Sequence, residues 1–284
     1  MGPSESAERG IAMQNNETTD LHAQYVRQTV ESGVPPLELR YTAINDCYSK
    51  MPVAYRTATF VNSVVMGVLR QEEFSFATNV TETGVRLAKW NILEAVRHLE
   101  AFANAGRHVE WISVRCPIAL AMNVDLYEWM QAVIAESGLK DPSKLCLEFP
   151  QSLLFCKESK ARLSVLDMKL LKVRTMLSGV GGVDCPTARL TAIPVDMALL
   201  DEATTALTND RNKPNVVPTM VQYLKSMRVD VIANGVSDDD QIRTLNRAEC
   251  IGYTTAKDYR GTTEQGARRM TLAQAIEQRE EEKY

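Results

Sequence analysis

An acid at the end of a buried strand is the first residue in this sequence whose type and place could do chemistry. Glu148 lies in the apolar run Lys144–Phe149, and Pro150 follows that run. Proline has no N–H group to donate, so we expect the strand to end there. Glu148 is then near the C-terminal end of a strand, where α/β barrels keep their catalytic side chains. Two interpretations stay open, a functional carboxylate and a structural glutamate in a salt bridge.

Cysteine and histidine, the other residue types that often carry chemistry, are scattered along the chain. The three histidines do not cluster, and no two of the six cysteines form a C-x-x-C pair, so zinc-finger spacing is absent. Cys116 and Cys185 lie near predicted strand ends, but the pattern places no histidine beside either, which argues against a Cys–His nucleophile. We interpret the cysteines as reduced, buried thiols, and we expect no metal and no cofactor.

The composition argues against several classes of partner. The 284 residues carry a net charge of -4 with a pI of about 5.6, which does not favour nucleic acid as a ligand. No apolar run is long enough to span a bilayer, and the first residues lack the apolar core of a signal peptide. These features predict a cytoplasmic protein without a membrane span.

The start of the chain differs from the rest. Residues 1–17 are small and polar without periodicity, which predicts a disordered N-terminal tail. Residues 18–36 are predicted to form a helical arm, with a helix at Thr18–Ser32 that ends before Gly33 and two prolines. The arm either packs on the outside of the domain or serves as a docking or dimerisation arm, so a homodimer is one hypothesis. Residues 37–284 are assigned to one barrel domain.

The remaining chain alternates between strands and helices. Leu37–Ile44 and Val53–Leu69 are predicted strands, and the link between them is too short for a crossover helix, which predicts an antiparallel hairpin. After it, apolar spacing predicts helices at Glu82–Asn104, Ala121–Ser137, Ser159–Leu171, Pro218–Met227, Asp238–Arg247 and Thr271–Glu281. Predicted strands at Glu110–Val114, Lys144–Phe149, Val173–Leu177, Val195–Leu199, Val229–Ala233 and Cys250–Tyr253 separate them. This order is typical of an α/β protein with a closed parallel barrel.

Several short motifs follow one another along the chain, namely Val65-Met-Gly-Val-Leu-Arg70, Ile112-Ser-Val-Arg-Cys116, Leu147-Glu-Phe-Pro-Gln-Ser152, Ile193-Pro-Val-Asp196 and Ile232-Ala-Asn-Gly-Val-Ser237. In this order they resemble Glu-Ala-Leu-x-Arg, Ser-Val-Asn-Leu, Leu-Glu-Ile-Thr-Glu-Ser, Leu-Pro-Val-Asp and Val-Ala-Glu-Gly-Val-Glu, which are motifs of the EAL-domain family, the bacterial cyclic-di-GMP phosphodiesterases. The resemblance covers about residues 37–253. It implies a modified TIM (β/α)8 barrel whose first two strands form an antiparallel pair, in agreement with the hairpin.

The family's chemistry does not fit these residues. The resemblance implies hydrolysis with two Mg²⁺ or Mn²⁺ ions, which carboxylate and amide oxygens hold. The matching positions carry Met66 for the signature Glu, Arg115 for an Asn, and Leu199, Asn234, Ser237, Gln151 and Ser178–Gly181 for other site residues. Of the family's polar set, Glu148, Gln241 and the phosphate-binding Arg70 remain. We therefore predict no catalytic residues, no metal site and no phosphodiesterase activity.

Two functions remain for such a barrel. The first is a non-catalytic signalling protein that acts by protein–protein interaction, with a protein as its partner. The second is a cyclic-di-GMP receptor without hydrolysis, whose binding residues would be Arg70, Arg115, Glu148, Asp196, Asn234 and Gln241. We favour the first, because so few polar partners for the nucleotide are left.

Overall fold

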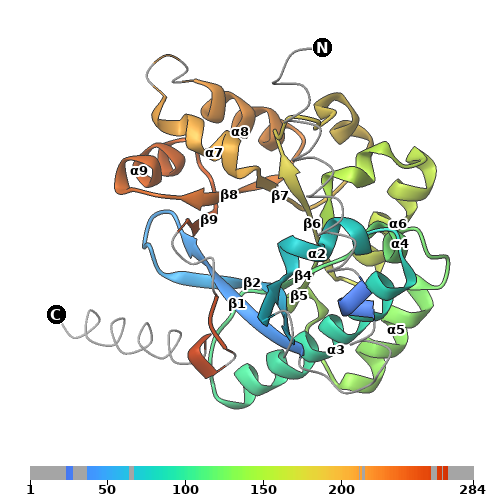
Figure 1. Ribbon diagram of the computed structural model, residues 1–284. Helices are drawn as coiled ribbons and strands as arrows, with labels where there is room; N and C mark the ends of the chain where they lie inside the picture. The colour runs from blue at the N-terminus through green and yellow to red at the C-terminus, as the bar shows by residue number, and fades with distance from the viewer. Residues whose placement is uncertain are drawn as a thin grey trace, which may run out of the picture.

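A closed ring of eight strands forms the centre of the molecule (Figure 1). The computed structural model describes residues 24–27, 37–63, 67–210, 212, 215–256, 261–263 and 265–267. Within them, the ring contains β1 (Leu37–Asp46), β2 (Pro52–Ser63), β4 (Ile112–Arg115), β5 (Leu145–Pro150), β6 (Arg174–Val180), β7 (Met197–Leu200), β8 (Asp230–Val236) and β9 (Gly252–Thr255). The predicted fold class, a TIM-like barrel with an antiparallel first strand pair, is confirmed.

The strand β1 gives the ring its antiparallel part. It pairs antiparallel with β2 along most of its length and antiparallel with β9 through Asn45 and Asp46, whereas the other neighbours in the ring are parallel. The Asp46 carboxylate accepts hydrogen bonds from the N–H groups of Tyr48 (3.1 Å) and Ser49 (2.6 Å), which fixes the tight turn into β2. The short link thus produces the hairpin that the sequence predicts.

Helices cover the outside of the ring (Figure 1). They are α2 (Gln71–Thr78), α3 (Glu82–Asn104), α4 (Ile118–Ala121), α5 (Leu126–Ser137), α6 (Glu158–Leu170), α7 (Glu202–Ala206), α8 (Val216–Ser226) and α9 (Asp239–Arg247). The helix α3 has the predicted bounds, because its apolar residues recur at helical spacing and Thr81 caps its first turn by accepting from the Gly84 N–H (3.3 Å).

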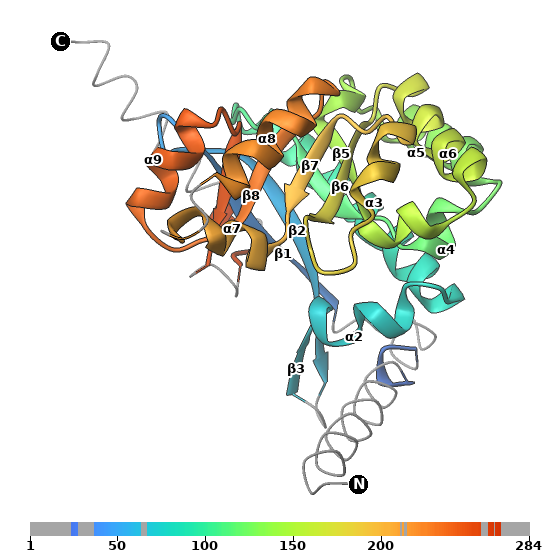
Figure 2. The ribbon, with the colours of Figure 1, turned by 90° about the horizontal axis from the view of Figure 1, so that it is seen from above.

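Two predicted elements are divided in the structure. The expected single strand Val53–Leu69 is two antiparallel strands, β2 and β3 (Gly67–Arg70), and β3 lies outside the ring (Figure 2). The expected helix Ala121–Ser137 is α4 and α5, because the Asn123 side chain accepts from the Asp125 N–H (2.9 Å) and forms a turn between them.

The N-terminal arm is described at residues 24–27, which are helical. There Val26 is buried against Val61, Leu69 and Phe74, so this part of the arm packs on the domain itself. The predicted tail, the rest of the arm, Met66 and the helix Thr271–Glu281 lie outside the described residues. No helix among those that are described is both long and apolar enough to cross a membrane.

Apolar side chains fill the interior of the ring below its mouth, and the mouth itself is polar. The plug consists of Ile44, Ala54, Trp111, Cys146, Met176, Met197, Leu199 and Ile232. On β2 and β5, the next inward residues toward the C-terminal ends are Arg56 and Glu148, because successive inward side chains along a strand are two residues apart. The fold therefore places the polar side chains directly above this plug.

Candidate functional site

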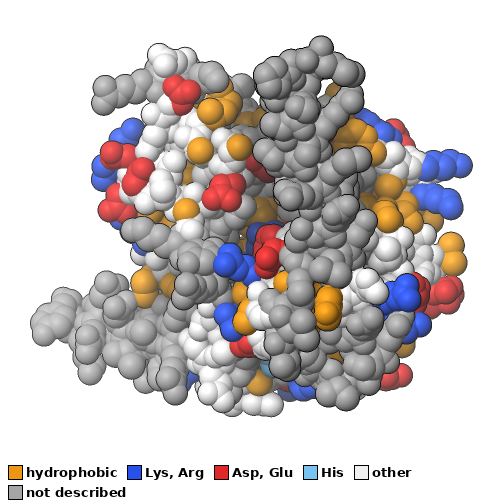
Figure 3. Space-filling view, viewed as in Figure 1, with side chains coloured by type: hydrophobic (Ala, Val, Ile, Leu, Met, Phe, Trp, Pro, Cys, Tyr) orange, Lys and Arg blue, Asp and Glu red, His pale blue; other side chains and the backbone are white. Residues whose placement is uncertain are grey.

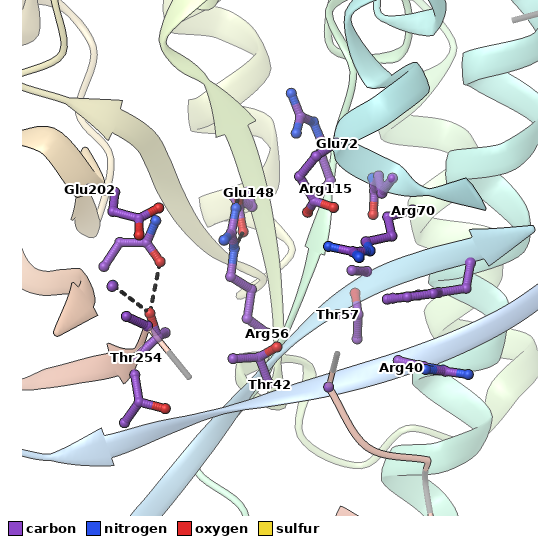
Figure 4. Close-up of a pocket in the computed structure, with 18 of the residues that line it drawn as sticks. Arg40, Thr42, Arg56, Thr57, Arg70, Glu72, Arg115, Glu148, Glu202 and Thr254 are labelled. Atoms are coloured by element: carbon purple, nitrogen blue, oxygen red, sulfur yellow. Dashed lines mark hydrogen bonds and ion pairs between the residues drawn. The ribbon is translucent and has the colours of Figure 1, made fainter. Parts of the chain in front are cut away.

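A polar pocket of about 280 Å³ lies at the mouth of the barrel (Figure 4). Residues from β1, β2, β3, α2, β4, β5, α7, β8 and β9 line it. Its charged side chains are four arginines and four glutamates, namely Arg40, Arg56, Arg70, Arg115, Glu72, Glu73, Glu148 and Glu202. Lys, Arg, Asp and Glu side chains lie side by side around the centre of this face (Figure 3). The charges of the lining balance, so the pocket is polar without a strong net charge.

The centre of the pocket is a bidentate ion pair between Arg56 and Glu148 (Figure 4). Arg56 Nε donates to one carboxylate oxygen at 2.7 Å, and Nη2 donates to the other at 2.5 Å. The Glu148 side chain is 1% exposed and that of Arg56 is 26% exposed. Such a fork contact is strong and geometrically specific. Both oxygens of Glu148 are therefore already engaged with a cation.

The two charges shift each other's protonation. Burial would raise the pKa of Glu148, but the charge and hydrogen bonds of Arg56, together with Arg115, lower it below its ordinary value. Burial by itself would lower the pKa of Arg56, and the Glu148 carboxylate more than offsets that effect. Glu148 is thus ionised at neutral pH and neutralised within the protein.

Arg115 adds a second positive charge near the same carboxylate. It lies on β4 directly beside Glu148 on β5, because the two residues pair in the parallel register. Burial is the main cause that lowers the pKa of Arg115, and the charge of Arg56 adds to this, whereas Glu148 and Glu72 oppose it. Two cations therefore lie around the carboxylate that could otherwise have bound a metal.

The structure brings some of the predicted site residues together and separates others. Arg70, Arg115, Glu148 and Asn234 line the mouth pocket. Asp196 and Gln241 do not line it. Asp196 precedes β7, forms an ion pair with Lys169 (2.8 Å) and accepts from Thr175. Gln241 lies on α9 and accepts from the Ser237 N–H (2.8 Å). Both side chains stabilise local structure, and both lie outside the pocket.

Asn234 is held by Thr254, which lies on the opposite side of the pocket from Arg70 (Figure 4). Its amide oxygen accepts from the Thr254 hydroxyl (2.7 Å), and that hydroxyl accepts from the Gly235 N–H (3.1 Å). Gly235 has a φ of 75°, and a Cβ there would be 2.6 Å from the Cγ of Glu202. The strand β8 thus needs a glycine here to bring Asn234 and Glu202 to the same rim.

Arg56 is the site residue that the sequence analysis missed, and the reason is the position of the signature match. Residues 65–70 were matched to the signature, but residues 67–70 form β3, outside the closed ring. The ring strand that pairs with β4 is β2, and its side chain beside Glu148 is Arg56. The hairpin turn itself could have found this residue, because it predicted that the second ring strand begins near Val53.

The described residues do not suit a pair of divalent ions. Among them, no group of three or more His, Cys, Asp or Glu side chains is placed to hold a metal. The one strand-end carboxylate of the predicted set, Glu148, has both oxygens bound by Arg56, and Arg115 adds a further positive charge. Hard divalent cations need oxygen ligands and would be repelled here. The arrangement is suited to an internal ion pair.

Comparison with known proteins gives the family. The model of the EAL domain matches residues 24–254. The PaMucR phosphodiesterase in complex with c-di-GMP has a similar fold, with 18% identity, a TM-score of 0.76, and coverage of 87% of this chain and 98% of that one. The FimX EAL domain from Pseudomonas aeruginosa bound to c-di-GMP is also similar, with 15% identity, a TM-score of 0.72, and coverage of 84% of this chain and 94% of that one. An EAL domain protein from Listeria monocytogenes has 16% identity, a TM-score of 0.72, and coverage of 86% of this chain and 95% of that one. No curated protein matches.

We predict that Arg56→Gln destabilises the fold strongly. The change leaves the buried carboxylate of Glu148 without its bidentate partner, and breaking a buried ion pair in this way costs about 3–5 kcal/mol. Urea denaturation at pH 7 measures the loss. Arg243→Gln is the matched control, because Arg243 and its partner Asp240 are exposed and such pairs contribute little. Equal midpoints for the two variants would contradict the central role of the pair.

The same pair predicts a pH dependence. The folded-state pKa of Glu148 is lowered, so its stabilisation is present above the unfolded pKa of about 4.3 and is lost as pH falls through the folded pKa. The stability difference between the native chain and Glu148→Gln should therefore be largest near neutral pH and shrink in acid. Denaturation curves from pH 7 to pH 3 measure it. A difference that stays constant over this range would argue against an ionised Glu148.

Proposed function

Because this chain belongs to the EAL domain family, we propose that it is a member that does not hydrolyse cyclic di-GMP and acts by binding another protein. The observation that carries the proposal is the bidentate Arg56–Glu148 pair at the mouth of the barrel. The family relates this chain to proteins that bind or hydrolyse cyclic di-GMP, and the pair supports a role for this chain without hydrolysis.

The reasoning against hydrolysis is electrostatic. Phosphodiester cleavage by two metals needs oxygen ligands that hold both ions and generate the attacking hydroxide. In this pocket a guanidinium lies 2.5 Å from the Glu148 oxygen that could have served as a ligand, and Arg115 lies beside it. Displacing Arg56 to admit a metal would leave its charge unpaired within the pocket. The site therefore favours its own ion pair over a divalent ion.

The reasoning for a protein partner rests on the contrast between a well-packed core and a neutralised pocket. The ring encloses its apolar plug, and a second, larger cluster of buried apolar residues lies between the ring and its helical layer. The mouth, by contrast, has equal numbers of arginines and glutamates, and its central carboxylate is paired with Arg56. A fold that retains its packing while its site is neutralised is suited to presenting a surface. This supports a role in protein–protein interaction.

A cyclic-di-GMP receptor is the second candidate, and one observation favours it. Arg70, Arg115 and Asn234 line a single pocket, so two cations and an amide converge where a nucleotide could enter. The PaMucR and FimX structures contain c-di-GMP, and their fold is similar. The pocket volume of about 280 Å³ is small for a dinucleotide, since even drug-sized ligands occupy roughly 300–1,000 Å³. We therefore rank this candidate second.

Hydrolysis assays test the main proposal. We expect the purified chain to release no linear product from cyclic di-GMP with Mg²⁺ or Mn²⁺, because the ligands for two ions are missing. The PaMucR phosphodiesterase is the positive control. Turnover above that of a heat-denatured sample would overturn the proposal that the domain is non-catalytic.

Calorimetric titration with cyclic di-GMP separates the two candidates. We expect no binding heat up to millimolar nucleotide, because Arg56 and Glu148 neutralise each other at the centre of the pocket. Micromolar binding that Arg115→Ala abolishes and Arg243→Ala leaves intact would establish the receptor instead. Arg243 lies on α9 outside the pocket, so it controls for a general loss of positive charge.

A further inference from the structure

The helix α6 is apolar on two opposite sides. Its inward side consists of the buried residues Ala161, Ser164, Val165 and Met168. Leu163, Leu166 and Leu170 are spaced three and four residues apart, so they lie on one face, and this face points away from the buried side. Leu163 is 58% exposed and Leu170 is 73% exposed. We call these three residues the leucine face; surface helices normally have polar residues there.

Position on the barrel makes the leucine face accessible. The helix α6 lies in the outer layer, away from the mouth (Figure 2). Its neighbour α5 has polar residues on its exposed side, such as Glu128, Gln131 and Glu136, so the leucine face is bordered by polar side chains there. A contiguous exposed apolar stripe bordered by charge is typical of an interaction site.

The margins of the leucine face are basic. Residues 157–172 carry five basic side chains, Lys157, Lys160, Arg162, Lys169 and Lys172, and two acidic ones, Glu158 and Asp167. Lys169 is already paired with Asp196, so its charge is compensated, and the Arg162 guanidinium donates to the Ala192 carbonyl (3.3 Å). The other four basic side chains still outnumber the two acidic ones. A partner that covers the leucines would therefore meet positive charge.

We propose that the leucine face is the docking site for an acidic amphipathic helix of a partner protein. This inference rests on the proposed function, since it names the surface and the chemistry of the partner. Spacing of three and four residues is the spacing at which two helices interlock their side chains. Acidic residues beside the partner's own leucines would pair with the basic margin.

A second copy of this chain fits the leucine face less well. Symmetric antiparallel pairing of two α6 helices would bring two copies of the same net positive segment, residues 157–172, together. Like charges that face each other across a helix pair oppose association. The acidic helix avoids this repulsion, so the charge pattern selects a different partner over self-association.

The probe is a synthetic helical peptide about three heptads long, with Leu at a and d and Glu at e and g. Repulsion between its glutamates keeps the peptide from pairing with itself at neutral pH. A peptide with Lys in place of Glu is the control for charge. Fluorescence anisotropy of either labelled peptide, titrated with the full chain, gives the affinity.

Two variants localise the binding. Leu163→Ser with Leu170→Ser removes the exposed part of the leucine face, and exposed positions tolerate such changes in stability. Val183→Ser is the matched control, because Val183 is fully exposed and lies in a turn outside α6. We expect the acidic peptide to bind with roughly micromolar affinity, the double variant to bind at least about tenfold more weakly, and the control variant to bind unchanged.

Several results would contradict the docking proposal, and each can be told apart from the others. The inference is overturned by no binding of the acidic peptide, by equal binding of the double variant, or by equal binding of the lysine peptide. It is also overturned by a dimeric mass in light scattering that the double variant reduces to a monomer, since the occupant would then be a second copy. Hydrolysis of cyclic di-GMP, measured on the same samples, separates a failure of the proposed function from a failure of the docking proposal. Turnover with intact peptide binding contradicts only the proposed function, and lost binding without turnover contradicts only the leucine face.

Discussion

A carboxylate buried at the mouth of a barrel needs a cation, and in this chain the guanidinium of Arg56 supplies it. Glu148 is almost fully enclosed, and its charge would be strongly unfavourable without a partner. The bidentate contact satisfies both oxygens, lowers the pKa of the carboxylate and fixes β2 against β5 across the intervening β4. A divalent ion could have met the same electrostatic need. The protein meets it with its own side chain, so the charge at this site is complete without a ligand.

The antiparallel first strand pair is the reason that Arg56 can reach Glu148. The hairpin reverses the chain, so that β2 runs parallel to β4 and directs its C-terminal half toward the mouth. Register then puts Arg56 level with Ser113, one pleat below the row of Arg115 and Glu148. A one-residue slip would turn Arg56 toward the helices and leave Glu148 to Arg115 alone. The ion pair and the topology therefore depend on each other.

Local patterns predicted most of the fold, because each depends on residues close in sequence. The helix α3 has its predicted bounds, since helical spacing and its cap agree, and the hairpin followed from a link too short for a helix. The predicted bounds of a strand were wrong where apolar residues continue through a turn, as between β2 and β3. The central pair was missed because Arg56 and Glu148 are far apart in sequence, and only strand register brings them together. Of the two residues, only Glu148 was singled out from the sequence, and a salt bridge was one of the two interpretations given for it.

The two surfaces of interest differ in what they leave unsatisfied. At the mouth, arginines and glutamates balance in number, and the central carboxylate is already hydrogen-bonded, so a ligand would have to exchange existing contacts for its own. On α6, Leu163 and Leu170 expose apolar area that water can only hydrate at a loss of free energy. Covering that area gains stability without breaking any contact that the free protein makes. Binding energy in this molecule is therefore more readily available on the outer helix than in the pocket at the mouth of the barrel.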